Sequence, residues 1–375
     1  MPTTTTRASI IRESPGHYET VTLELDDPRK GEVQVKLAAS GLCHSDDHLQ
    51  TGDLQVMTYP FCGGHEGSGV VTKVGPDTPG FEEGDHVVFS FVPSCGQCMA
   101  CRRGDFNLCD KGALLLVGSR ADDAEDFRMK LDGENVGQMC GISTFSEYTT
   151  ADVASVIKID KDIPLKSAAL VGCGVPTGWG TAVEAGQVKP GDVVIVMGIG
   201  GIGINAVQGA KHAGATSIIA VDPTPFKREM AQEFGATDVF EDMDQATAYA
   251  QSITQGQGAD VTLITVGVLK PEHPAQGLAS IRKGGTVVAT GLGAMTDMAP
   301  ISMFDLTLMQ KRLQGAIIGA QSPHSDIPKL LRMYQAGQLK LDELITKEYT
   351  LDQVTEAYED MHAGKNIRGV IVFND

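Results

Sequence analysis

Residues 193–212 constrain the fold more than any other stretch of the chain. An uninterrupted apolar run, Val193–Met197, leads directly into a glycine-rich turn over residues 198–203, and a helical pattern then continues to about His212. An apolar run with no polar residue predicts a strand that is buried on both faces, as in a parallel sheet. A G-x-G-x-x-G turn between such a strand and a helix allows the backbone to approach a pyrophosphate group.

The same alternation of strand and helix repeats downstream. Apolar strands are expected at 217–221, 260–264 and 285–289, with helical segments such as 227–234 between them. This order predicts a doubly wound parallel sheet. Asp222 directly follows the strand at 217–221, where a carboxylate can accept hydrogen bonds from ribose hydroxyls and repel a 2′-phosphate. The sequence therefore favours an NAD site, and the alternative is that Asp222 is only a turn residue before proline.

The residues before about 150 show a different texture. Short alternating stretches at 32–37, 69–75 and 86–89 predict strands, and glycine and proline separate them. Many short strands with regular turns are typical of a barrel-like all-β body. The acidic stretch Arg120–Glu134 has no such pattern, and we expect it to form a long surface loop.

The end of the chain is expected to return to this first body. A capping box is predicted at 350–353 and a closing strand at 368–373. We therefore expect an α/β protein with two domains. The first is a β-barrel domain of residues 1–174 and 323–375, and the second is a doubly wound domain of residues 175–322.

The charge balance excludes several kinds of partner. Lys and Arg number 30 against 48 Asp and Glu, a formal net charge of −18. Such a chain repels phosphate backbones and anionic membranes, so neither nucleic acid nor a membrane is an expected partner. The N-terminus shows no leader pattern, and no apolar run approaches the roughly 18 residues of a membrane helix. We expect a cytoplasmic protein.

Four of the 8 cysteines fall close together, at Cys95, Cys98, Cys101 and Cys109. Zinc in a structural role takes four ligands in a tetrahedron, and short spacings let neighbouring turns direct several sulfurs at one ion. We favour a structural metal at this four-cysteine lobe. Ordinary buried thiols and an iron–sulfur site are the alternatives.

A second set of candidate ligands is dispersed along the chain. Cys43, His65 and Cys173 could supply two thiolates and one imidazole and leave a fourth position open for substrate. Taken singly, a cysteine is more often a small buried hydrophobic residue, and a histidine is more often an ordinary core or surface residue. Spacing alone leaves this trio as one interpretation among others.

The order of the motifs resembles that of the zinc-containing medium-chain alcohol dehydrogenases. Gly-x-Cys-x-Ser-Asp at 41–46, Gly-His-Glu-Gly at 64–67, the four-cysteine lobe, Cys-Gly-x-x-Thr-Gly at 173–178 and the glycine turn at 198–203 follow one another as in that family. The likeness covers nearly the whole chain. It implies a GroES-like β-barrel catalytic domain, a Rossmann domain, NAD(H) and two zinc ions per chain.

The resemblance also implies roles for single residues. The trio would hold a catalytic zinc and the four-cysteine lobe a structural zinc. Asp46 would orient His65, and Glu66 would be a carboxylate able to approach the metal. Ser45 and His48 would form a proton relay that ends at a histidine on the surface.

Cofactor and substrate contacts are implied in the same way. The cofactor residues would be His44, Thr177, Gly198, Gly200, Gly201, Ile202, Gly203, Asp222, Lys227, Val266 and Arg368. The substrate cleft would be lined by Phe91, Met139, Cys140 and Leu292. This mainly apolar lining suits primary alcohols and aldehydes with a hydrocarbon or aromatic body. His44 stands where many relatives carry arginine, so its phosphate contact would be weaker or pH-dependent.

Within the family, the sequence looks closest to actinobacterial nicotinoprotein alcohol dehydrogenases. In that subgroup NAD(H) stays bound, and an artificial acceptor such as a nitroso dye reoxidises it. The stretches 42–46, 120–134 and 295–309 carry this likeness. Two alternatives remain: a formaldehyde dehydrogenase acting on a mycothiol-type adduct, and a non-catalytic nicotinamide-binding protein. By resemblance we also expect a homodimer, with contact near residues 300–304.

Overall fold

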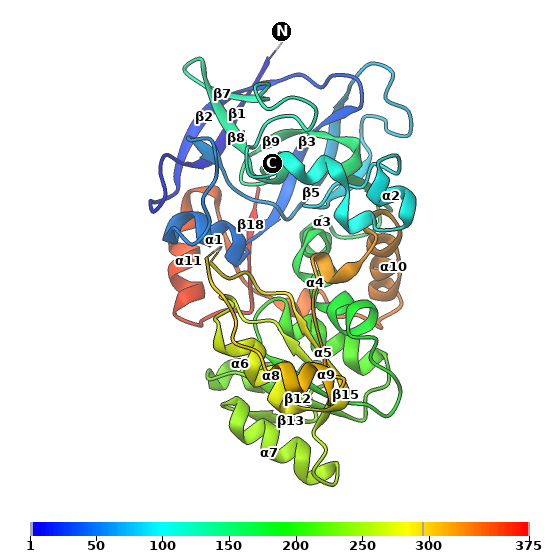
Figure 1. Cartoon of the computed structure of the whole chain (residues 1–375). Helices are drawn as coiled ribbons and strands as arrows, with labels where there is room; N and C mark the ends of the chain where they lie inside the picture. The colour runs from blue at the N-terminus through cyan, green and yellow to red at the C-terminus, as the bar shows by residue number, and fades with distance from the viewer. Residues whose placement is uncertain (1–2, 295, 374–375) are drawn as a thin grey trace. The chain divides into compact units, whose positions relative to one another are not determined.

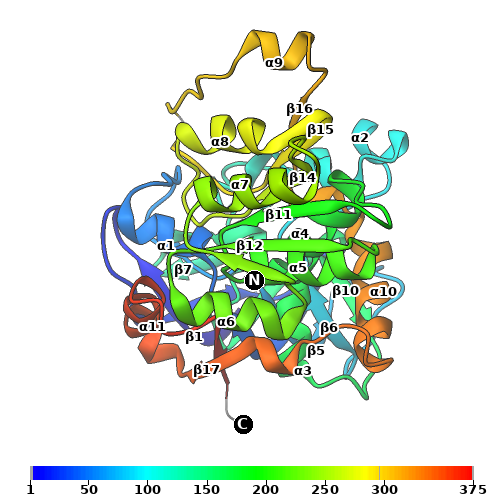
Figure 2. The ribbon, with the colours of Figure 1, turned by 90° about the horizontal axis from the view of Figure 1, so that it is seen from below.

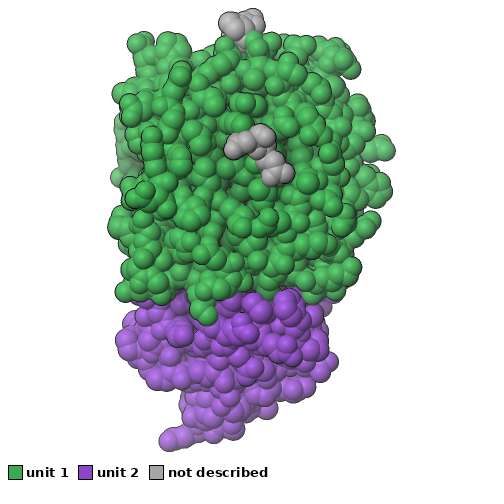
Figure 3. Space-filling model, turned by 180° about the vertical axis from the view of Figure 1, so that it is seen from behind, with its two compact units in different colours: residues 1–173, 322–375 green, residues 174–321 purple. Residues whose placement is uncertain are grey.

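The computed structural model describes residues 3–294 and 296–373. The chain divides into two compact units, residues 1–173 with 322–375 and residues 174–321 (Figure 3). Each limit expected from the sequence lies one residue from the observed one. The tail therefore folds with the N-terminal residues and not with the segment that precedes it.

The first unit is built on two β layers. One is a closed barrel with strand order β1-β2-β7-β8-β4, and the other is a seven-stranded sheet of order β10-β6-β5-β3-β18-β17 in which β9 also pairs with β3. The strands are β1 (Thr3–Ile11), β2 (Glu19–Asp26), β3 (Glu32–Gly41), β4 (Phe61–Cys62), β5 (Gly67–Val74), β6 (His86–Phe89), β7 (Met129–Leu131), β8 (Glu134–Gln138), β9 (Tyr148–Asp152), β10 (Val156–Ile159), β17 (Ile345–Tyr349) and β18 (Arg368–Val372). The helices are α1 (His44–Thr51), α2 (Met99–Arg103), α3 (Leu165–Ala168), α10 (Pro323–Gln335) and α11 (Val354–His362).

Strand β3 occupies the centre of the larger sheet. The alternation at 32–37 predicted a half-buried strand, but most of β3 is buried, polar positions such as Gln34 included. The reason is tertiary, because β3 pairs with β5, β9 and β18 along different parts of its length. Its end at Gly41 leads directly into the segment that carries the first cysteine of the trio.

The prediction of a long surface loop at Arg120–Glu134 holds only for residues 121–126, which form turns with 122–125 exposed, and is wrong for the rest. The stretch contains β7 and the start of β8, which belong to the barrel. Arg120 and Arg128 are 7% and 3% exposed, and both donate through Nε to Glu32, at 3.0 and 2.8 Å. In the sequence, charged residues that form buried ion pairs cannot be distinguished from charged residues that face solvent, and this explains the error.

The second unit is a six-stranded sheet of order β13-β12-β11-β14-β15-β16 in which every pair is parallel. Its strands are β11 (Val193–Met197), β12 (Ser217–Val221), β13 (Asp238–Phe240), β14 (Ala259–Ile264), β15 (Ile281–Ala289) and β16 (Arg312–Gly315), and its helices are α4 (Gly174–Gly180), α5 (Gly203–His212), α6 (Pro225–Phe234), α7 (Met243–Ile253), α8 (Glu272–Ser280) and α9 (Met303–Thr307). Helices α5 and α6 cover one face of the sheet and α7 and α8 the other (Figure 2). The doubly wound prediction is confirmed, and the order is that of a dinucleotide-binding sheet.

The ribbon places α1 and α11 next to each other in the first unit, although they are far apart in sequence (Figure 1). The capping box at Thr350 and Gln353 is present, but it opens a short 3-10 turn that continues into α11. Among the described residues, no helix combines the length and the apolar character needed to cross a membrane.

Candidate active site

The trio is brought together from three distant segments of the first unit. Cys43 directly precedes α1, His65 lies between β4 and β5, and Cys173 ends the N-terminal part of this unit. One ligand atom from each lies within 4.8 Å of the other two, and all three residues are buried. Two sulfurs and an imidazole nitrogen are a donor set that suits zinc, with a fourth position left for another ligand.

The electrostatics of the trio show how closely its members interact. A hydrogen bond with Cys173 lowers the pKa of Cys43 well below its usual value. The same hydrogen bond, together with burial, raises the pKa of Cys173 well above its usual value. Burial alone would lower the pKa of His65, but Asp46 and Cys43 raise it well above normal. Within the cysteine pair, negative charge is therefore favoured on the Cys43 sulfur, and the Cys173 sulfur holds the shared proton.

Asp46 orients the imidazole of the trio. Its Oδ2 lies 2.8 Å from His65 Nδ1, and its Oδ1 accepts a hydrogen bond of 2.8 Å from the Gly64 N–H. Asp46 is fully buried. Because Nδ1 faces the carboxylate, Nε2 is the nitrogen left for a metal, as in other carboxylate–histidine–metal arrangements.

Glu66 is held beside the trio by a dense polar network. Its carboxylate forms a short contact with Arg368, and both residues are buried. The backbone N–H of Glu66 donates to Thr144 Oγ1 at 3.2 Å, and its carbonyl accepts from Ser40 at 3.0 Å. The structure thus joins two residues that the sequence assigned to separate roles.

The two relay residues lie on α1. Ser45 Oγ is 3.8 Å from Cys43 Sγ, which places a hydroxyl next to the trio. The expectation that His48 lies at the surface is wrong, because His48 is only 3% exposed. Its Nδ1 lies 3.5 Å from a carboxylate oxygen of Asp53, whose side chain is 49% exposed. Helix α1 packs against its own unit and buries His48 there. The sequence did not show this, because a helix of eight residues is too short for a clear amphipathic pattern.

Two of the four expected substrate residues, Phe91 and Cys140, lie near the trio. The Phe91 ring meets the His65 ring edge-on at a centroid distance of 5.6 Å, and Phe91 packs against the core cluster that contains Met139 and Cys140. Burial raises the pKa of Cys140 to about 12, so this thiol stays neutral. Leu292 belongs to the other unit, where it is 48% exposed.

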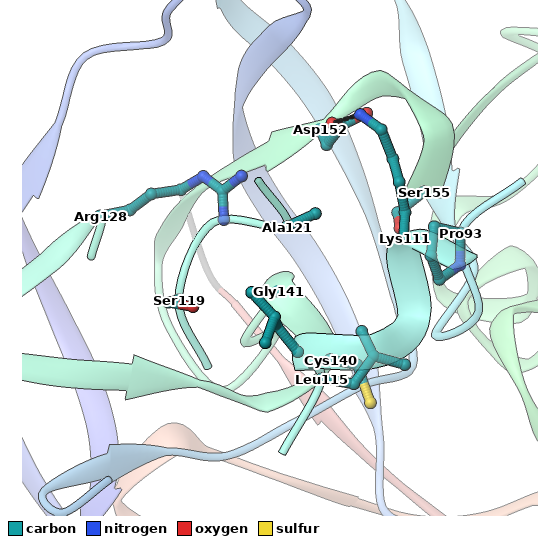
Figure 4. A pocket seen from close by; sticks show the side chains of 11 residues that line it. Pro93, Lys111, Leu115, Ser119, Ala121, Arg128, Cys140, Gly141, Asp152 and Ser155 are labelled. Atoms are coloured by element: carbon teal, nitrogen blue, oxygen red, sulfur yellow. Dashed lines mark hydrogen bonds and ion pairs between the residues drawn. The ribbon is translucent and has the colours of Figure 1, made fainter. Parts of the chain in front are cut away.

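A small cavity is lined in part by Cys140 and Gly141. It measures about 30 Å³, and its lining includes Arg128, Lys111 and Asp152. The Arg128 guanidinium points toward its middle (Figure 4). Since one water needs roughly 10–15 Å³ measured in this way, the space suits one or two water molecules.

The four-cysteine lobe is assembled locally around α2. Its four cysteine sulfurs all lie within 4.8 Å of one another, and none of the four cysteines forms a disulfide. Backbone N–H groups point at the sulfurs; those of Cys101 and Asp110, for example, donate to Cys98 Sγ at 3.4 Å. These donors, led by the N–H of Asp110, lower the pKa of Cys98 to about 7. The geometry fits a metal ion with four thiolate ligands and no open position.

The glycine turn of the second unit has the shape that a pyrophosphate needs. Gly198 has φ of 90°, and a Cβ at Gly203 would lie 1.9 Å from the Gly198 carbonyl oxygen. A Cβ at Gly200, by contrast, would meet nothing within 4 Å. Backbone can therefore approach a ligand at Gly200, while the other two glycines shape the turn.

Asp222 is fixed at the end of β12, with its carboxylate oxygens accepting from the N–H groups of Ile199 and Thr224, both at 2.9 Å. Of the other expected cofactor residues, Thr177 lies in α4, Lys227 in α6 and Val266 just after β14. His44 and Arg368 belong to the first unit.

Two tyrosines that the sequence did not indicate, Tyr18 and Tyr358, support the site. The hydroxyl of Tyr18 donates to the Asp46 carbonyl at 3.0 Å, and that of Tyr358 donates to the Cys43 carbonyl at 3.3 Å. Burial raises the pKa of both phenols well above normal, so both remain donors. The sequence carries no signal for them, since isolated tyrosines give no spacing pattern.

Fold and site define a zinc-dependent, nicotinamide-linked oxidoreductase, and the chain belongs to the zinc-binding alcohol dehydrogenase family. Residues 29–161 match the alcohol dehydrogenase GroES-like domain, and residues 201–336 match the zinc-binding dehydrogenase domain. The expected family, the combination of GroES-like and Rossmann folds, and the enzyme class are confirmed.

Individual relatives sharpen this assignment. The chain is 50% identical, over 98% of both chains, to the NDMA-dependent alcohol dehydrogenase of Amycolatopsis methanolica. It is 46% identical, over 99% of both, to alcohol dehydrogenase B of Mycobacterium tuberculosis. Among solved structures, benzyl alcohol dehydrogenase from Acinetobacter calcoaceticus superposes with a TM-score of 0.90 at 29% identity, covering 99% of this chain and all of that one.

Proposed function

We propose that this enzyme interconverts primary alcohols and aldehydes, with zinc bound by Cys43, His65 and Cys173 and NAD(H) bound on the glycine turn. The observation that carries the proposal is the convergence of three buried metal-ligand atoms beside an aromatic and apolar wall. The names of two relatives, an NDMA-dependent alcohol dehydrogenase and a benzyl alcohol dehydrogenase, support this substrate class.

When bound, zinc supplies a Lewis acid for the alcohol oxygen, and the oxidised nicotinamide supplies a hydride acceptor. The protein's own residues handle the proton. Ser45 Oγ, which lies beside Cys43 Sγ, would accept it from the substrate hydroxyl, and His48, one helical turn further along α1, would receive it next. Asp53 then connects His48 to solvent, since it is exposed and lies 3.5 Å from His48 Nδ1. Phe91, Met139 and Cys140 exclude water and fit an apolar substrate body.

We further propose that the cofactor is NAD(H) and that it stays in the site between turnovers. The Asp222 carboxylate, fixed by two backbone N–H groups, would repel a 2′-phosphate and favours NAD over NADP. Retention is supported by the likeness to an NDMA-dependent relative, because an external acceptor is needed when the cofactor does not exchange.

We propose that the four-cysteine lobe holds a second, structural zinc.

We also propose that the second unit mediates a homodimer. Strand β16 is the last strand of its sheet, and Met303, Phe304 and Leu308, which precede it, are 65%, 55% and 70% exposed. An uncovered strand edge with apolar side chains suits pairing with a second copy of the chain. A cytoplasmic location would keep the free thiols reduced.

The test uses the protein purified and dialysed without added cofactor. Adding benzyl alcohol should produce the near-ultraviolet absorbance of reduced nicotinamide, and a nitroso dye should then abolish it. A signal that appears only with added NAD would refute retention but keep the dehydrogenase. No signal even with NAD would refute alcohol oxidation and favour the thiol-adduct or non-catalytic alternative. The Cys173→Ser variant is the matched control and should stay silent in each case.

A further inference from the structure

Two buried tyrosines contact the backbone of the segment that supplies the trio with its first ligand. Tyr358, on α11, is fully buried, and Tyr18 is 8% exposed. Their rings stack with a centroid distance of 6.0 Å and an interplanar angle of 28°. Neither side chain is a metal ligand, and neither is needed by the proton relay. Their position nevertheless gives them a specific task.

Each hydroxyl donates to a carbonyl of that segment. Tyr358 reaches the carbonyl of Cys43, and Tyr18 reaches the carbonyl of Asp46. One of these residues is an expected metal ligand, and the other orients the His65 imidazole. A third link lies alongside, where Nε2 of His362 on α11 is 2.6 Å from a carboxylate oxygen of Asp47 on α1.

We propose that Tyr18 and Tyr358 are positioning residues that clamp the first turn of α1 so that Cys43 and Asp46 keep their places in the metal site. The inference rests on the proposed function, because it assumes a metal at the trio. Metal and catalytic groups must be held to within about 0.5 Å, which requires support from residues behind them. The first turn of α1 needs such support because it has no side-chain cap at Cys43.

The clamp adds to the strand pairing of β18 with β3 that joins the C-terminal segment to the N-terminal residues. Helix α11 is separated from α1 by some three hundred residues of sequence, and its buried Tyr358 is the contact that touches a metal ligand. A hydrogen bond contributes about 0.5–1.5 kcal/mol, so losing one hydroxyl should change metal retention by roughly two- to twelvefold.

The experiment compares zinc release from the full-length holoenzyme to an excess of a chromogenic chelator. The kinetic phase that is missing in Cys173→Ser belongs to the trio. The test variants are Tyr18→Phe and Tyr358→Phe, which keep the aromatic rings. Tyr349→Phe is the matched control, because Tyr349 is equally buried in the same unit but its hydroxyl donates to Asp360.

We expect the trio phase to be two- to twelvefold faster in both test variants and unchanged in the control. The cobalt-substituted enzyme should show shifted ligand-field bands in the test variants only, which a general loss of stability would not produce. Wild-type release rates and unshifted bands in Tyr358→Phe would overturn the clamp while leaving the metal site intact. If no phase disappears in Cys173→Ser, the trio holds no metal, and the proposed function fails together with the clamp.

Discussion

The two cysteine sites of the first unit are assembled in opposite ways. The four-cysteine lobe takes all its ligands from one short stretch around α2, and Cys95 and Cys98 remain partly exposed. The trio takes its ligands from three distant segments and buries all of them. Four ligands close a tetrahedral site, whereas three leave a position open for substrate. The comparison teaches that local turns suffice for a structural site and that a reactive one requires the whole fold.

The supporting groups differ in the same sense. The sulfurs of the lobe accept hydrogen bonds from backbone N–H groups of their own loop. The trio is instead supported by side chains, with Asp46 coming from the first turn of α1 and Phe91 and Tyr358 from distant segments. Substitutions should therefore affect stability at the lobe and chemistry at the trio.

The largest effect should come from removing a ligand of the trio. Cys173→Ser should lower kcat at least about a thousandfold, because Lewis-acid stabilisation of the transition state is worth several kcal/mol. The melting temperature should change little, since the trio does not hold a loop in place. Steady-state kinetics measure the fall in kcat, and calorimetry on the same preparation measures the melting temperature. A variant that no longer folds would contradict the predicted difference between the trio and the lobe.

A change outside both metal sites tests whether the stability of the first unit can be lowered without loss of either metal. Glu32→Gln leaves Arg120 and Arg128 buried with one carboxylate fewer, and breaking such a buried pair costs about 3–5 kcal/mol. Urea unfolding should show this loss while both metals stay bound. Loss of the lobe's metal in this variant would mean that the two regions are coupled.

The same carboxylate predicts a pH dependence. Burial alone would raise the pKa of Glu32, but Arg128, Arg120 and the Arg29 N–H together lower it from 4.5. A group with a lowered pKa in the folded state contributes its full stability above its unfolded value and loses it as the pH falls through the folded one. Wild-type enzyme should thus lose stability below about pH 4.5 more steeply than Glu32→Gln, as acid titration of unfolding would show.

Removing one ligand of the lobe should act on stability first. Cys98→Ser should release one zinc and lower the melting temperature by roughly 5–10 °C, the shift expected for a loss of a few kcal/mol. Below that temperature kcat should stay near the wild-type value. If kcat falls as far as in Cys173→Ser, the lobe is not merely structural.

The smallest of these effects concerns the support of the trio. Asp46→Asn should weaken zinc binding about tenfold to a hundredfold, because partners behind a ligand typically contribute that much. Competition with a chelator measures it. Asp85→Asn is a suitable comparison, since Asp85 is equally buried but pairs with Lys158, and it should leave zinc affinity unchanged.

Particular residues show how far the sequence reaches. Val193–Met197 was predicted to the residue because its apolar run is uniform and both its faces are covered. The four clustered cysteines and the glycine turn were equally clear, since their spacing is local. The trio was not resolved by spacing, and only the resemblance to a family selected it from many dispersed residues.

Tertiary pairing accounts for what the sequence could not show. Arg120 and Arg128 were expected in a surface loop because their partner Glu32 is almost a hundred residues away. His48 was expected at the surface, yet packing against its own unit buries it. Tyr18 and Tyr358 remained unnoticed, since a single hydroxyl that reaches a distant carbonyl leaves no trace in local composition.

The central claim is that the chain carries two zinc sites with different tasks. The most direct test is element-specific anomalous diffraction at the zinc edge on crystals of the full-length enzyme. The account predicts two peaks per chain, one among Cys95, Cys98, Cys101 and Cys109 and one among Cys43, His65 and Cys173. A single peak at the lobe, with none at the trio, would contradict it.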